Sequence, residues 1–170
     1  KILLTHGHID HCGSAGILAE ELGVSIEGPH EADRYWIDRL AEDGAKYGIT
    51  GKPFEPSRWL DDGDRVTVGE LTFDVRHCPG HTPGHMAVMA ESRGERLLVG
   101  GDALNNAVVS FARPDWPFGS DLDKDAAAAT RRTLLDRLAT DRIPLIGFHL
   151  PWPGVGYVER KDRAYRFVAA

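Results

Sequence analysis

A short segment near the start of the chain gathers residues that bind metal ions. His6-Gly7-His8-Ile9-Asp10-His11 holds three imidazoles and one carboxylate within six residues. Imidazole nitrogen and carboxylate oxygen are common ligands of zinc and similar divalent ions, and alternate positions of an extended segment point to one side. His6 and His8 can therefore hold one ion together, and Asp10 and His11 can serve a second ion nearby. A solvated polar loop, the plain alternative, does not account for this spacing.

Further donors follow later in the chain, each where an apolar run ends. They are His81 within residues 78–85, Asp102 after two glycines, and His149. Seven donors exceed the four of a closed structural zinc site, whereas a bridging carboxylate at Asp102 would give two ions three or four protein ligands each and a shared water. We therefore predict an open catalytic site for two divalent metal ions, with zinc expected and iron or manganese as alternatives.

The elements that must position these donors alternate along the chain. Apolar spacing predicts a buried strand at 2–4 that runs into a polar loop at 6–11, then a helix at 14–22, a strand at 24–26 and a helix at 30–46. An antiparallel meander is expected next, with strands at 66–68, 71–75, 86–90 and 96–99. A helix at 123–138, a strand at 145–148 ending at His149, and a closing hairpin of 157–159 with 164–168 complete the prediction.

Composition limits the classes of function. The 170 residues, 42% of them hydrophobic, fit one domain over residues 1–170. The net charge of −6 leaves no basic stripe for nucleic acid, and no apolar run approaches the ~20 residues that cross a membrane. Cys12 and Cys78 are too few for a disulfide framework, and nothing at the start is typical of a signal peptide. We expect a small-molecule substrate and a cytoplasmic protein.

The order of the motifs resembles one known family. His-x-His-x-Asp-His, then Gly-His at 80–81, Gly-Asp at 101–102 and a final histidine are similar to the metallo-β-lactamase superfamily. The resemblance implies an α/β fold with four layers in the order helix, sheet, sheet, helix. It also implies a first metal held by His6, His8 and His81, a second held by Asp10, His11 and His149, and Asp102 as the bridge between them.

The two halves of the chain resemble different branches of that superfamily. Residues 5–8 and 77–85 resemble small hydrolases of the glyoxalase II type, which implies hydroxyacylglutathione-like thioester hydrolysis. Residues 110–116 and 147–154 resemble the branch that holds lactonases and organophosphate hydrolases. The family usually has a block of strands before its first motif, and the strand at 2–4 has no earlier partner. We therefore expect a chain truncated at its N-terminus, engineered or recombined.

The expected chemistry is hydrolysis of a thioester or lactone-type carbonyl by a hydroxide shared between two ions about 3.5–4 Å apart. Asp10 is the candidate catalytic residue that orients this water and passes a proton to the leaving group. Two alternatives stay open, a metal-binding scaffold with little turnover and an iron oxygenase with a single metal. Metal content together with turnover separates the three.

The remaining histidines and aromatic residues allow two interpretations each. His85 and His77 either orient ligands through hydrogen bonds or are ordinary core histidines, whereas His30 is expected to begin a helix. Aromatic residues of 111–118, with Trp36 and Trp152, either line a substrate pocket or pack in the core. A sheet edge left open by missing strands favours a homodimer or a domain swap.

Overall fold

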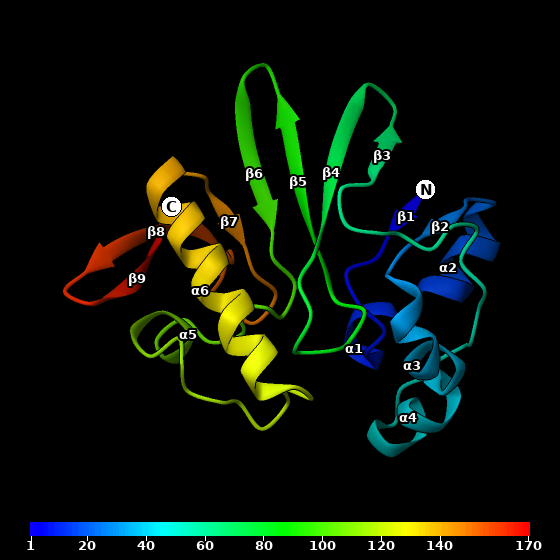
Figure 1. Cartoon of the computed structure of the whole chain (residues 1–170). Coiled ribbons are helices and arrows are strands. Elements are labelled where there is room, and N and C mark those ends of the chain that lie inside the picture. Colours follow the sequence, from blue (N-terminus) through cyan, green and yellow to red (C-terminus); the bar gives the residue numbers. More distant parts are fainter.

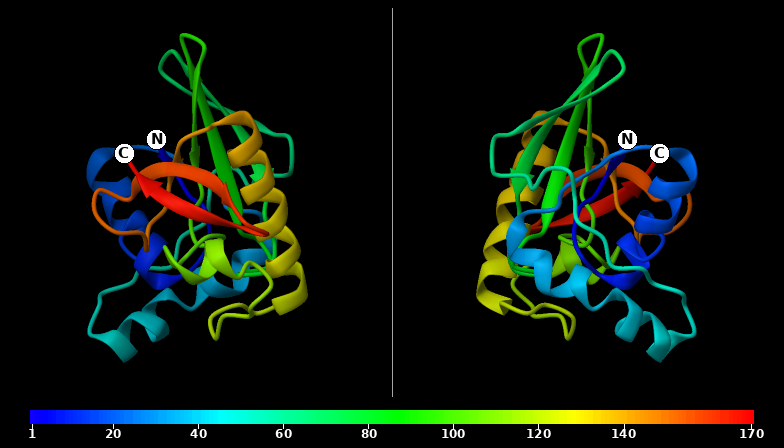
Figure 2. Two further views of the ribbon diagram at one scale, coloured as in Figure 1. Left: turned by 90° about the vertical axis from the view of Figure 1, so that its left-hand side faces the viewer. Right: turned by 90° about the vertical axis from the view of Figure 1, so that its right-hand side faces the viewer.

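A computed structural model describes all 170 residues. A seven-stranded sheet with the order β3-β4-β5-β6-β7-β8-β9 forms the centre of the molecule, and β1 and β2 make a second, two-stranded sheet. Helices α1 to α4 lie on one side of the strands and α6 lies on the other (Figures 1 and 2). The predicted α/β class, with helices outside the sheets, is confirmed. No helix is both long and apolar enough to cross a bilayer.

The bounds of the elements are as follows. The strands are β1 (Ile2–Leu3), β2 (Ile26–Glu27), β3 (Arg65–Val68), β4 (Leu71–His77), β5 (Met86–Ser92), β6 (Glu95–Val99), β7 (Leu145–Ile146), β8 (Val155–Lys161) and β9 (Ala164–Ala169). The helices are α1 (Ile9–Cys12), α2 (Ala15–Leu22), the short 3₁₀ helix η1 (Glu31–Asp33), α3 (Arg34–Asp38), α4 (Leu40–Tyr47), α5 (Val109–Ala112) and α6 (Lys124–Asp141).

The strand directions explain why donors far apart in sequence meet. Strands β4, β5 and β6 are antiparallel in turn, as the predicted meander requires, and β7 is parallel to β6. The C-terminal ends of β4, β6 and β7 therefore lie at one edge of the sheet. His81, Asp102 and His149 follow these three ends.

The predicted succession of strand, helix and strand at 2–26 forms a parallel pair, in which Ile2 and Leu3 of β1 lie opposite Ile26 and Glu27 of β2. Two predictions for the first 47 residues need correction. The expected loop at 6–11 contains a helical turn, α1, because the His8 carbonyl accepts hydrogen bonds from the amides of His11 and Cys12, each at 3.0 Å. The helix expected at 30–46 is divided into η1, α3 and α4, because Arg39 leaves helical geometry with φ −98° and ψ 5°.

Two main hydrophobic clusters lie on either side of the ligand-bearing segments. The larger one packs α6 and α5 against β5 to β8, and includes Leu104, Phe111 and Leu135. The other joins the segments around β1, α1, α3 and α4 through residues such as Leu4 and Leu40. The Thr5 carbonyl accepts a hydrogen bond from the Met86 amide of β5 at 2.7 Å, which holds the end of β1 against the central sheet.

Candidate metal centre

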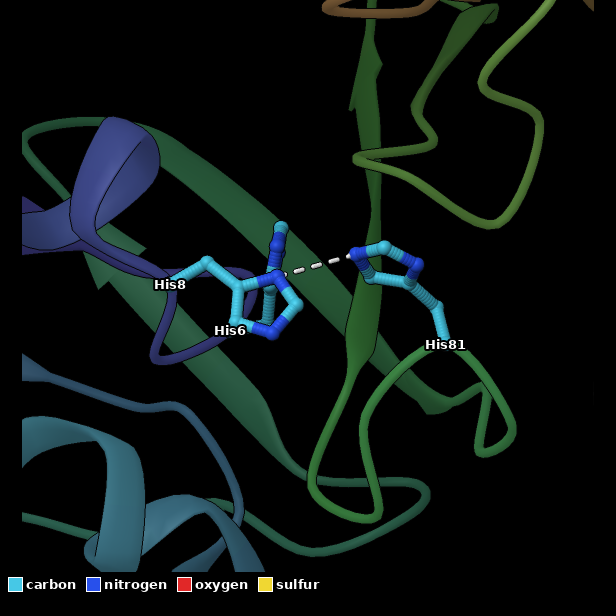
Figure 3. A group of neighbouring side chains, drawn as sticks. All are labelled: His6, His8 and His81. Carbon is cyan, nitrogen blue, oxygen red and sulfur yellow. Dashed lines mark hydrogen bonds between the residues drawn. The ribbon is translucent and has the colours of Figure 1, made fainter. Parts of the chain in front are cut away.

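The rings of His6, His8 and His81 converge from two separate segments. His6 and His8 follow β1, whereas His81 lies in the loop between β4 and β5 (Figure 3). Nε2 of His81 and Nδ1 of His8 are only 3.1 Å apart, and Nε2 of the buried His6 has no hydrogen-bond partner. One nitrogen from each ring falls within 4.8 Å of the others, so these three imidazoles can hold one ion.

Asp10, His11 and His149 form a second group, which meets the first at Asp102. Their ligand atoms also lie within 4.8 Å of one another. Asp102 Oδ1 is 3.1 Å from His11 Nε2, and its Oδ2 is 3.1 Å from His149 Nε2 and 3.4 Å from His81 Nε2. One carboxylate therefore faces both groups.

The donor set fits divalent metal ions. His11 Nε2 and Asp102 Oδ1 are buried and make no hydrogen bond despite their short separation. His6 Nε2, elsewhere in the cluster, is also buried without a hydrogen-bond partner. Buried polar atoms are normally paired, because leaving one without a partner costs free energy. Buried donors that converge without a hydrogen-bond partner, as these three atoms do, are an arrangement that an ion would complete. All seven predicted ligands are thus brought together, and their roles as ligands stay a prediction.

Burial favours the neutral form of His6 and His8, which is the form that binds a metal ion. Burial, followed by the neighbouring histidines, lowers the pKa of His6 well below its ordinary value. Burial and then His81 lower the pKa of His8 to about 4. For Asp102, burial acts to raise the pKa, but contact with His11 and the nearby imidazoles outweighs it and the pKa lies below its ordinary value. His6 and His8 therefore offer neutral nitrogens, and Asp102 offers an ionised carboxylate, near neutral pH.

A cavity of about 690 Å³ opens over the cluster. Asp10, Asp102 and His149 line it, and the side chains of Asp10 and His149 are 45% and 42% exposed. His6, in contrast, is fully buried. Apolar side chains form part of the wall: Ile9, Trp36, Tyr47, Ile49 and Phe118.

Two buried residues contact the predicted ligands from behind. His85 Nε2 accepts a hydrogen bond from the Asp102 amide at 3.0 Å, which favours the orienting role over the second interpretation, an ordinary core histidine. Asp121 Oδ1 lies 3.5 Å from His81 Nδ1, and its Oδ2 accepts a hydrogen bond from the buried Arg131 at 2.8 Å. Such partners commonly fix the orientation of metal-bound imidazoles.

Sequence reasoning missed Asp33, Asp121 and Arg131. Asp33 and Asp121 stand near other acidic residues, and nothing adjacent to them in sequence distinguishes them from surface carboxylates. Arg131 did carry a signal, because it stands among Ala127, Ala128, Leu134, Leu135 and Leu138 on the buried stripe of α6. A cation on an apolar stripe indicates a buried counter-charge.

Other residues singled out by the sequence have different places. His30 begins η1 as predicted, since its Nδ1 accepts a hydrogen bond from the Ala32 amide. His77 stacks on His30 and contacts the Pro83 carbonyl rather than a ligand. Among the aromatic residues, Phe111 is a core residue at 0% exposure and Trp152 is 94% exposed, so neither lines the cavity.

Comparison with known proteins agrees with this geometry. Residues 1–148 match the model of the metallo-β-lactamase superfamily. The hydroxyacylglutathione hydrolase GloC of Haemophilus influenzae is 32% identical over 95% of this chain and 73% of its own length.

Two solved structures share the fold and carry metal pairs of different kinds. The dizinc quorum-quenching lactonase AidC, in complex with a product, is 27% identical with a TM-score of 0.78 over 99% of this chain and 63% of its own. TTHA1623 in a di-iron-bound form is 28% identical with a TM-score of 0.69, over 88% of this chain and 69% of its own. This chain thus spans somewhat less than two thirds of AidC. It belongs to the metallo-β-lactamase superfamily.

Proposed function

We propose that this chain is a binuclear metal-dependent hydrolase that cleaves a thioester or lactone-type carbonyl. The observation that carries the proposal is the convergence of seven donors in two groups joined by Asp102, with five of the seven lining one cavity. The relationship to GloC supports a thioester substrate, and the fold shared with AidC supports a lactone.

Each group of ligands would hold one ion. His6, His8 and His81 would bind the first, Asp10, His11 and His149 the second, and Asp102 both. When bound, such ions polarise a carbonyl oxygen and lower the pKa of a bound water toward about 7. No serine or cysteine nucleophile is then required, which agrees with the burial of both cysteines.

Asp10 is the residue of the set that is best placed to handle protons. Its Oδ2 lies 3.4 Å from His11 Nε2 and 3.6 Å from His149 Nε2, and the carboxylate faces the cavity. In hydrolysis the water oxygen bonds to the acyl carbon, the bond to sulfur or ring oxygen breaks, and a proton must reach the leaving group. We assign the orientation of the water and the transfer of that proton to Asp10.

The cavity wall also constrains the substrate. Trp36, Tyr47 and Phe118 line one part of it, and Lys46 and Asp43 lie at the same opening. A substrate with a carbonyl near the ligands and an apolar arm along this wall would bury that arm favourably. A neutral acyl group fits this arrangement.

The proposal is tested by metal analysis of purified protein together with hydrolysis assays on S-lactoylglutathione, acyl-homoserine lactones, a cephalosporin and an aryl phosphotriester. We expect near two equivalents of metal and turnover of the thioester or the lactone. Two equivalents without any turnover would favour the scaffold alternative, and one equivalent of iron with oxygen uptake would favour an oxygenase.

The role of Asp10 is tested by Asp10→Asn against Asp38→Asn, a matched change of an exposed carboxylate outside the cavity. We expect kcat to fall about 10²–10⁴-fold in the first variant, as for loss of a positioned general acid–base group, and to stay unchanged in the second. Full turnover of Asp10→Asn with both metals retained would reject the assignment.

A further inference from the structure

Asp33 is a fully buried carboxylate that accepts three hydrogen bonds from the loops around the first group of ligands. Its Oδ2 accepts from the Gly7 amide at 2.8 Å and from the Thr82 hydroxyl at 2.7 Å. Its Oδ1 accepts from the Gly84 amide at 2.6 Å. All three donors are neutral groups, so Asp33 is held by hydrogen bonds rather than by these partners' charge.

The three donors have one feature in common, which is their position next to histidines of the site. Gly7 separates His6 from His8, and Thr82 follows His81. The third donor, Gly84, precedes the histidine that accepts the Asp102 amide. One carboxylate therefore connects the segment after β1 to the loop between β4 and β5, the two segments whose imidazoles must meet.

Close packing makes this connection stiff. A Cβ atom on Gly7 would lie 2.8 Å from Trp36 Cβ, and one on Gly84 would lie 2.7 Å from the Asp33 amide nitrogen. The His30 amide also donates to the Gly84 carbonyl at 3.2 Å. Both loops thus press against η1 and α3 at glycines, and the carboxylate sits between them.

A buried carboxylate at this place costs free energy of folding. Burial raises the pKa of Asp33 even though Thr82, Gly7 and Gly84 all donate to it. A well-packed apolar group at such a place is often neutral or stabilising by comparison. The carboxylate offers something that packing does not, namely two oxygens that accept from both loops at once.

We propose that Asp33 is a positioning residue that fixes the separation of His6 and His8 from His81, and so sets the affinity of the first metal ion. This inference rests on the proposed function, since it takes those three imidazoles as ligands. None of the three hydrogen bonds reaches Asp10, His11 or His149, so the second group should be spared.

Asp33→Asn is the direct test. An amide has one accepting oxygen, so at least one of the three donors loses its partner. Metal affinity is measured by Zn²⁺ competition with a chromophoric chelator, in a His149→Ala background that weakens the second site. We expect the remaining ion to bind about 10–100-fold more weakly with Asn at 33, as for other residues that orient ligands. In the otherwise intact protein, we expect the ion of the second group to be retained.

Two further variants separate positioning from general stability. Leu40→Ala removes a fully buried side chain from the core cluster around β1 and α3, and this aliphatic side chain takes no part in the hydrogen bonds to Asp33. Thr82→Val removes one donor and leaves the two backbone donors, and Thr82→Ser restores the hydroxyl. We expect Thr82→Val to lower first-site affinity by about tenfold or less, Thr82→Ser to recover it, and Leu40→Ala to lower the thermal midpoint without changing affinity.

The inference is overturned if Asp33→Asn leaves first-site affinity within twofold, if it weakens both sites equally, or if Leu40→Ala weakens binding as much. Should Asp33→Asn fail to fold, the Thr82 pair decides, and equal affinities of Thr82→Val and the wild type would reject the inference. Failure of the proposed function would give a different result. The wild type would then bind no metal ion, or it would bind one that His6→Ala does not remove.

Discussion

The buried pair of Asp121 and Arg131 yields a prediction with a defined magnitude. Arg131 is 1% exposed and donates to the Pro114 and Trp116 carbonyls, each at 2.9 Å, as well as to Asp121. Asp121→Ala would leave the guanidinium with two neutral carbonyls and no counter-charge. Breaking one side of a buried ion pair costs about 3–5 kcal/mol. At about 2–4 °C for each kcal/mol in a chain of this size, the thermal midpoint should fall by roughly 6–20 °C.

The neighbouring pair of Asp115 and Arg132 supplies a matched control. These side chains are 67% and 53% exposed, and exposed ion pairs contribute about 0–1 kcal/mol. Urea unfolding of both alanine variants, followed by tryptophan fluorescence with a chelator present, measures the difference without metal. Equal losses for Asp121→Ala and Asp115→Ala would refute the argument from burial.

The pH dependence of the same pair has a defined sign. Burial acts to raise the pKa of Asp121, but contacts with His81 and Arg131 outweigh it and the pKa lies below its ordinary value. A carboxyl with a depressed pKa in the folded state stabilises above its unfolded pKa and loses that contribution only as the pH falls through the folded pKa. The gap between the two alanine variants should therefore be the same at pH 5 and pH 8.

Three further predictions follow from the site and its supports. Burial lowers the pKa of His8 to about 4 and that of His85 to about 3, against 6.5 for a free imidazole. The metal-free protein should therefore lose stability as the pH falls below about 6.5, by on the order of 1 kcal/mol per pH unit for each such histidine. Denaturant unfolding at several pH values measures this loss. A free energy of unfolding that stays constant from pH 7 to pH 5 would contradict the prediction. Gly80→Ala should lower the free energy of unfolding by about 1–3 kcal/mol more than Gly63→Ala in the same assay. Both glycines have positive φ, but only a Cβ atom at position 80 would meet a neighbour, the Ala127 amide nitrogen at 2.2 Å. A chelator should remove metal in two phases, the faster one abolished by His149→Ala, because exposed ligands exchange more readily than buried ones.

Much of the site was predictable because its chemistry is dense in sequence. Four of the seven donors fall within residues 6–11, and neither a core nor a surface requires such a run. The alternation of apolar residues also located the meander, whose strand directions then bring the other donors to one edge. Here local pattern and tertiary arrangement agree, so sequence reasoning succeeds.

The failures have a common physical origin in contacts between distant segments. Asp33 reaches donors 26 to 51 residues away, and no local pattern records those hydrogen bonds. Asp121 gains its importance from an arginine one helix later. Asp33 and Asp121 are therefore separated in sequence from the groups that they hold in place.

The predicted ligands are attached to two separate hydrophobic cores. Leu4 and Cys12 belong to the cluster around β1 and α3, whereas Cys78, Ala103 and Leu150 belong to the cluster under α6. Each stands within three residues of a predicted ligand. The donors thus form a polar layer between two hydrophobic cores, and buried ligand atoms on both sides of this layer lack a hydrogen-bond partner. Ions bound in this layer would bind only the folded chain and would connect the two cores. Each ion present at a hundredfold over its Kd would add about 2.7 kcal/mol to the free energy of unfolding. The same geometry that would make the site reactive would therefore also make the metal-loaded fold the more stable one.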